Sequence, residues 1–145
     1  MNKKTLPNGA KAYQRKDKED RAIVYRDWHR ELKGLYMFDL DSVEWRYKNG
    51  VGVPVAIIEL TRVDHERNGK AIIVSKRYLD AILERFLERD TQGKFIMHMA
   101  SCVNVPAYLT LFREDCSQFW VYNITEAIYW VKYTPEEYKD FLGGL

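Results

Sequence analysis

The sequence predicts an α/β domain in which a mixed sheet carries helices on both faces, and three patterns indicate it. Aromatic and apolar residues fill two long runs, 35–47 and 53–63, that are typical of strands. Residues 76–90 instead repeat apolar side chains at helical spacing. Two shorter apolar runs, 107–112 and 119–124, then add strands after the helices, so the sheet combines separated parts of the chain.

Local signals predict the remaining elements. A helix over 20–33 repeats apolar residues every four positions and precedes the first strand. Lys48-Asn49-Gly50 supplies a turn that joins the two long runs into a hairpin. A short strand is expected over 71–74, and a second central helix runs from about Thr91 to the proline at 106. Thr134-Pro135 begins the last helix, with an N-cap followed by proline at the first position.

Composition is that of one globular domain. At 145 residues, with 46% hydrophobic and 14% aromatic residues, the chain can fill a single core, and 30% charged residues exclude wholesale disorder. We expect residues 1–19 to be a flexible basic segment and 20–145 to be the domain. No apolar stretch suits a membrane span or a secretory leader, and two cysteines suit a reducing compartment. A cytoplasmic protein without a membrane partner is expected, as a monomer or a homodimer.

Positive charge is concentrated near the N-terminus. Residues 1–34 carry ten Lys and Arg against five Asp and Glu, whereas the whole chain has a net charge of +2. Such an arm can follow phosphates, and Arg26, His29 and Arg30 are the candidate nucleic-acid contacts. A solvated tail explains the same charge equally well.

The hairpin carries the residues that suggest chemistry. Alternate side chains of a strand share a face, so Asp39 and Asp41 lie on one face of the first strand, and Glu59 and Thr61 on one face of the second. Carboxylates in apolar runs are costly unless a cation compensates them, and Mg²⁺ or Mn²⁺ prefers such oxygen ligands. The alternative is that the aspartates occupy an exposed strand end and Glu59 pairs with an arginine.

The run from Asp41 through the hairpin to Ile57-Ile58-Glu59-Leu60-Thr61 resembles the core of the PD-(D/E)XK nuclease superfamily. The likeness extends over about 20–125, and the stretch from Tyr25 to Thr61 also resembles small phage and bacterial members. It implies a restriction-endonuclease-like fold, DNA as partner and a Mg²⁺-dependent deoxyribonuclease in the cytoplasm, that of the host if a phage encodes the chain. It also implies that Asp41, or Asp39, together with Glu59 and the Leu60 carbonyl holds the metal, with Glu31 as a further acid from the helix.

The chain departs from the superfamily pattern at one position. Thr61 stands where the superfamily has the lysine that orients water and stabilises charge on the phosphate. A threonine hydroxyl has no positive charge for that second role. Because some members relocate this lysine, Lys76 and Lys94 are the candidate replacements, and Gln92 resembles a glutamine found on the helix after the Glu-X-Lys strand.

Three classes of function therefore stay open. The first is a metal-dependent nuclease with a degenerate Glu-X-Thr motif. The second is a catalytically inactive module on the same fold that binds nucleic acid or protein, and the third is a structural domain. A cation within reach of Glu59 favours the enzyme. Asp64-His65-Glu66 is a weaker candidate for a metal site, because it falls in a polar loop.

Overall fold

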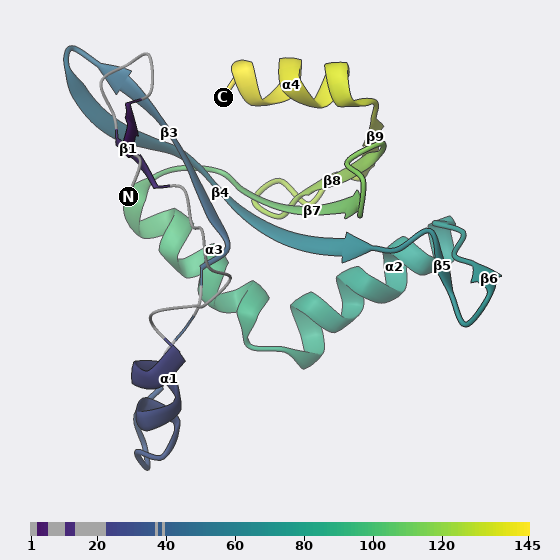
Figure 1. Ribbon diagram of the computed structural model, residues 1–145, viewed down its shortest axis with the longest axis horizontal. Coiled ribbons are helices and arrows are strands. Elements are labelled where there is room, and N and C mark those ends of the chain that lie inside the picture. The colour runs from purple at the N-terminus through teal and green to yellow at the C-terminus, as the bar shows by residue number, and fades with distance from the viewer. Residues whose placement is uncertain (1–2, 6–10, 14–22, 37, 39) are drawn as a thin grey trace. The chain divides into compact units, whose positions relative to one another are not determined.

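The computed structural model describes residues 3–5, 11–13, 23–36, 38 and 40–145 (Figure 1). The chain divides into two compact units, Met1–Asp39 and Leu40–Leu145. The first unit contains the antiparallel strands β1 (Lys3–Thr5) and β2 (Lys11–Tyr13) and the helix α1 (Ile23–Arg30). Most of the segment expected to be flexible, 1–19, lies outside the described residues.

Helix α1 corresponds to the helix expected over 20–33, but it ends three residues early, at Arg30. Beyond that point the chain tightens, because the Glu31 N–H donates to the carbonyl of Trp28, only three residues back. Gly34 then adopts a φ of 75°, which a helix cannot accommodate. Residues 20–22 lie outside the described ranges.

A five-stranded sheet forms the centre of the second unit, in the order β3-β4-β7-β8-β9. Its strands are β3 (Ser42–Lys48), β4 (Val51–Val63), β7 (Ala107–Arg113), β8 (Phe119–Asn123) and β9 (Trp130–Tyr133). Strands β4 and β7 run parallel, and every other neighbouring pair is antiparallel. The expected α/β class with a mixed sheet is confirmed, and the arrangement is consistent with a restriction-endonuclease-like fold.

Helices cover both faces of this sheet (Figure 1). The connection from β4 to β7 forms α2 (Lys76–Glu84), the π-helical turn η1 (Arg85–Arg89) and α3 (Gln92–Val103), and α4 (Pro135–Gly143) covers the other face. On the α4 side, Ala56 and Ile58 belong to a buried cluster against which Phe141 packs. Ile57 and Leu109 point to the opposite face and are also buried. No helix in the described ranges is long and apolar enough to cross a membrane.

The predicted hairpin is present, with a shorter first strand. Asn49 and Gly50 have φ values of 52° and 77°, as a tight two-residue turn requires. The first strand begins at Ser42 instead of residue 35. The ladder stops there because the next backbone donor of β4, the N–H of Leu60, is taken by the carboxylate of Asp41 at 2.9 Å.

Three further expectations need correction. The short strand over 71–74 is instead a small hairpin of β5 (Glu66–Arg67) and β6 (Lys70–Ala71), turned by Asn68 and Gly69 with positive φ. The helix over 76–90 changes to π-helical geometry from Arg85 onward. Strand β9 was not among the predicted elements, because its four residues are too few to show a period.

Candidate metal centre

The β3–β4 pairing brings Asp41 and Glu59 to one place. Ser42 pairs with Ile58, so the antiparallel register places Asp41 opposite Glu59 and on the same face of the sheet. The Asp41 Oδ2 atom accepts a hydrogen bond of 2.9 Å from the Leu60 N–H, which anchors this carboxylate directly before the start of β3. The hairpin therefore brings these two residues together, and their role as metal ligands stays a prediction.

This convergence depends on a β-bulge. Near the turn, Lys48 pairs with Val51, and the register shifts by one residue between Glu44 and Trp45. Without the shift, Asp41 would stand opposite Ile58 and would share the face of Ile58, away from Glu59. The bulge therefore creates the carboxylate pair.

Glu59 is held in an environment that disfavours its negative charge. Its side chain is only 5% exposed. Burial raises the pKa of Glu59 from an ordinary 4.5 to about 8, with further upward contributions from the hydrogen bond and the negative charge of Asp41. Within the described part of the chain, the Oε2 atom of Glu59 has no hydrogen-bond partner although it is buried. An oxygen in this state is what a bound cation would satisfy.

The donor set fits a hard divalent cation with an incomplete protein shell. Two carboxylates, Asp41 and Glu59, face one another, and Mg²⁺ is commonly held by one or two carboxylates together with water and substrate phosphate. The described residues contain no group of three or more His, Cys, Asp or Glu side chains that would hold a metal. Asp39, the alternative first acid, lies outside the described residues, and a metal-binding role for the Leu60 carbonyl stays a prediction.

A cavity of about 140 Å³ lies on the same face of the sheet as Glu59. Its sheet side is formed by Thr61, two residues after Glu59, and by Leu109, which pairs with Glu59 in the β4–β7 register. Gln92 lines it from the start of α3, so Thr61 and Gln92 do come together. The cation in this lining is Arg85, from η1.

Arg85 was not among the site residues predicted from the sequence. The helical period over 76–90 placed it next to the core position Phe86, at the edge of the apolar stripe, where a long charged side chain is unremarkable. One signal was present: Arg85 follows Ile82 by three residues, and both of them line the cavity.

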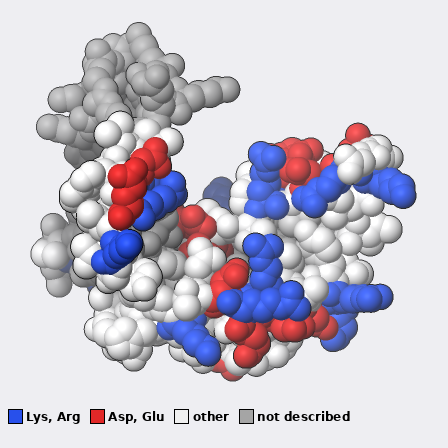
Figure 2. Space-filling view, turned by 90° about the horizontal axis from the view of Figure 1, so that it is seen from below, with Lys and Arg blue, Asp and Glu red and all other residues white. Residues whose placement is uncertain are grey.

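The two lysines proposed as replacements lie elsewhere on the helices. Lys76 donates to Asp80 at 2.7 Å, and its side chain is 89% exposed. Lys94 is exposed on α3. Neither lysine is among the residues that line the cavity beside Glu59. Viewed from below, Lys and Arg are interspersed with Asp and Glu on the visible face (Figure 2).

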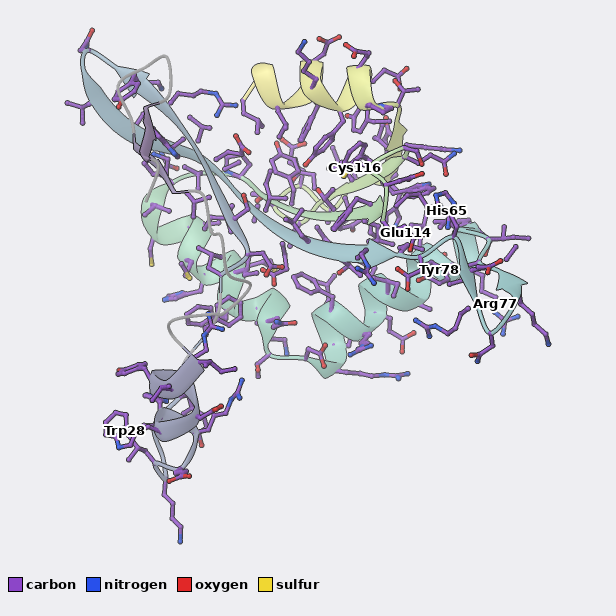
Figure 3. All side chains as sticks on the ribbon, viewed as in Figure 1. Trp28, His65, Arg77, Tyr78, Glu114 and Cys116 are labelled. Carbon is purple, nitrogen blue, oxygen red and sulfur yellow. The ribbon has the colours of Figure 1, made fainter. Side chains whose placement is uncertain are left out.

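The alternative, in which the aspartates lie at an exposed strand end and Glu59 pairs with an arginine, agrees with the structure only in part. Asp41 is indeed exposed, directly before β3. Among the described residues, however, Glu59 has no arginine partner: Arg62, the nearest one in sequence, pairs with Asp64 at 2.9 Å. In the polar loop, His65 lies beside the β5–β6 hairpin and contacts Asp115 at 3.0 Å (Figure 3). The hydrogen bond with Ser117, and then the one with His65, lower the pKa of Asp115 to about 2.

The candidates from the N-terminal region belong to the first unit. Arg30 bonds Asp27 at 3.1 Å, and the rings of His29 and Tyr25 are 6.0 Å apart. Arg26 is on the same helix, and Glu31 follows directly after it. The roles of Arg26, His29 and Arg30 in nucleic-acid binding, and of Glu31 as a further acid, stay predictions.

No protein-family model, curated protein or solved structure matches the chain. The resemblance to the PD-(D/E)XK superfamily thus depends on the residues of the β3–β4 hairpin, and membership of that superfamily is a hypothesis.

Proposed function

We propose that the chain is a divalent-metal-dependent nuclease that hydrolyses phosphodiester bonds of DNA. The observation that supports this most strongly is the Asp41–Glu59 pair, in which a buried carboxylate faces a second carboxylate and one of its oxygens has no partner among the described residues. Such an arrangement is costly in a protein that has no use for it. Phosphodiester hydrolysis is the proposed reaction because the hairpin resembles the PD-(D/E)XK core.

Asp41 and Glu59 would hold the metal, Mg²⁺ or Mn²⁺. When bound, the ion supplies Lewis-acid chemistry, lowering the pKa of a water molecule and neutralising charge on the phosphate. The Leu60 N–H fixes one oxygen of Asp41. Glu59 holds a proton below its pKa of about 8, and this proton must leave to solvent before the carboxylate can serve as a ligand. Activity should therefore increase with pH between 6 and 8.

A cleavage assay tests the proposal. Wild-type protein should nick supercoiled DNA and shorten a labelled single strand in Mg²⁺ or Mn²⁺, and Asp41→Asn and Glu59→Gln should each abolish cleavage. Asp80→Asn, which alters a surface carboxylate paired with Lys76, is the matched control and should stay active. Thr61→Lys should raise the rate, because an ammonium group would stand on the Glu59 face, and one such contact is typically worth about 10²–10³ in rate.

The second candidate is a binding module that uses the same fold without catalysis. Thr61 favours it, since its hydroxyl cannot stabilise phosphate charge as a lysine does. The two functions differ in one result. If wild type and Thr61→Lys bind Mn²⁺ yet leave single- and double-stranded substrates intact, the nuclease is contradicted and the binding module is supported.

A further inference from the structure

The cavity on the Glu59 face of the sheet has polar residues in its lining that the metal site does not require. On its sheet side, the Thr61 hydroxyl stands on the face of Glu59. On its helix side, Arg85 and Gln92 bring a guanidinium and an amide to the same space of about 140 Å³. One liquid water occupies roughly 30 Å³, so the cavity has room for a group larger than a single water.

Arg85 presents a usable positive charge there. Its Nε atom lies 3.5 Å from the Oδ2 atom of Asp90, which also lines the cavity. Among the described residues, neither terminal nitrogen of Arg85 has a hydrogen-bond partner. The side chain is 69% exposed and can be reached from solvent. These nitrogens form the planar fork that matches phosphate oxygens.

The backbone holds this arrangement in place. Arg85 begins the π-helical turn η1, and such turns are frequent at functional sites. The Asp90 N–H donates to the Arg85 carbonyl at 3.0 Å, so the carboxylate and the guanidinium of the pair belong to one turn of chain. Gly93 lets α3 approach η1 closely, since a Cβ there would stand 2.7 Å from the carbonyl oxygen of Phe86. Gln92 is thereby brought beside Arg85.

We propose that this cavity is a subsite for a phosphate group of the nucleic-acid backbone, with Arg85 as its cation and Gln92 and Thr61 as hydrogen-bond donors. The proposal rests on the proposed function for its substrate class. In this proposal Arg85, on η1, supplies the positive charge that Thr61 lacks. Asp90 competes with the phosphate for the guanidinium, so the ion pair is exchanged when the phosphate binds.

The test is the affinity for a fluorescein-labelled oligonucleotide, measured by anisotropy in Ca²⁺ over a range of salt concentrations. Arg85→Ala should weaken binding by roughly tenfold, because a charge-assisted contact is lost, and should reduce the slope of log affinity against log salt by about one. Asp90→Asn should strengthen binding, since the competing charge is removed. Arg89→Ala is the matched control and should bind as wild type does, because Arg89 lies in η1 but pairs with Glu84 outside the cavity.

The opposite signs separate a binding role from a structural one. If the Arg85–Asp90 pair merely holds η1 together, Arg85→Ala and Asp90→Asn should weaken binding alike, and that result overturns the subsite. Equal affinities for Arg85→Ala and Arg89→Ala overturn it as well, as does a wild type that binds no oligonucleotide. Circular dichroism identifies a variant that has lost its fold, and Arg85→Lys, which keeps the charge, should then recover part of the affinity.

Failure of the proposed function has a different signature. A wild type that neither binds Mn²⁺ nor cleaves DNA contradicts the nuclease. A loss of oligonucleotide affinity specific to Arg85→Ala would still support the phosphate subsite. Conversely, DNA cleavage that Arg85→Ala leaves unchanged, together with unchanged binding, supports the nuclease and overturns the subsite.

Discussion

Glu59 is the residue at which the site carries the free-energy cost of a buried carboxylate. It is buried in the strand that pairs with both β3 and β7, and the charged group that raises its pKa beyond the effect of burial is another acid, Asp41. Holding its proton removes the charge but leaves a buried oxygen that has no partner within the described part of the chain. A divalent cation would satisfy that oxygen and compensate both carboxylates at once. The residue therefore has a use in the metal-bound protein that it lacks without metal.

The raised pKa of Glu59 predicts how stability depends on pH. Between pH 4.5 and about 8, the folded protein keeps a proton that the unfolded chain has released. The stabilisation from this proton is thus complete at low pH and is lost as the pH rises through about 8. In EDTA, the free energy of unfolding in urea should fall over this window relative to that of Glu59→Gln, which has no proton to lose. A difference that is independent of pH would contradict the raised pKa.

The sequence predicts which site residues share a face only where the alternation within a single strand determines it. The shared face of Glu59 and Thr61 follows from alternation alone. The pairing of Asp41 with Glu59 also needs the register between two strands, which the bulge changes by one residue. Pro54, beside the bulge, was an available signal, because proline inside a strand is typical of bulges and edges. The spacing of Arg85 from Ile82 was a weak signal, but its position in the cavity also depends on the π-helical turn, which no local pattern predicted.

At the scale of elements, local signals succeeded where backbone conformation is fixed by a few neighbouring residues. The Asn49-Gly50 turn is present as predicted. So is the N-terminus of α4, where the side chain and backbone of Thr134 exchange hydrogen bonds with Glu137 in a capping box. The start of β3 was wrong, since apolar composition continues before Ser42 while the ladder ends at the Asp41 carboxylate.

The contact between η1 and α3 supplies a test at this scale. Gly93→Ala places a methyl group 2.7 Å from a backbone oxygen, which cannot move as a flexible side chain would. Forcing the helices apart should destabilise the protein by about 1–3 kcal/mol, as overpacking typically does, and should displace Gln92 from the cavity. Gly143→Ala, in α4, is the control: no neighbouring atom of the described residues lies within 4 Å of its added methyl group, so the free energy of unfolding should be unchanged or slightly higher. Equal unfolding curves for Gly93→Ala and wild type would refute the close packing.

At the scale of the whole molecule, the carboxylate pair and the cavity belong to the unit Leu40–Leu145, whereas the helix α1, with Arg26, His29 and Arg30, belongs to the unit Met1–Asp39. The proposed chemistry belongs to Leu40–Leu145, and the predicted phosphate contacts of Arg26, His29 and Arg30 belong to Met1–Asp39. Metal binding should therefore depend on the carboxylates of the hairpin, whatever the basic N-terminal residues contribute to DNA affinity.

Calorimetric titration with Mn²⁺ at pH 7 tests the central claim, that Asp41 and Glu59 form a divalent-cation site. Wild type should bind one ion per chain and, in buffers of different ionisation enthalpy, should release about one proton, because Glu59 must lose its proton to bind. Glu66→Gln, which removes a carboxylate from the polar loop, should behave identically, and Glu59→Gln should bind no ion. Binding by Glu59→Gln that equals wild type in affinity and in proton release would contradict the account.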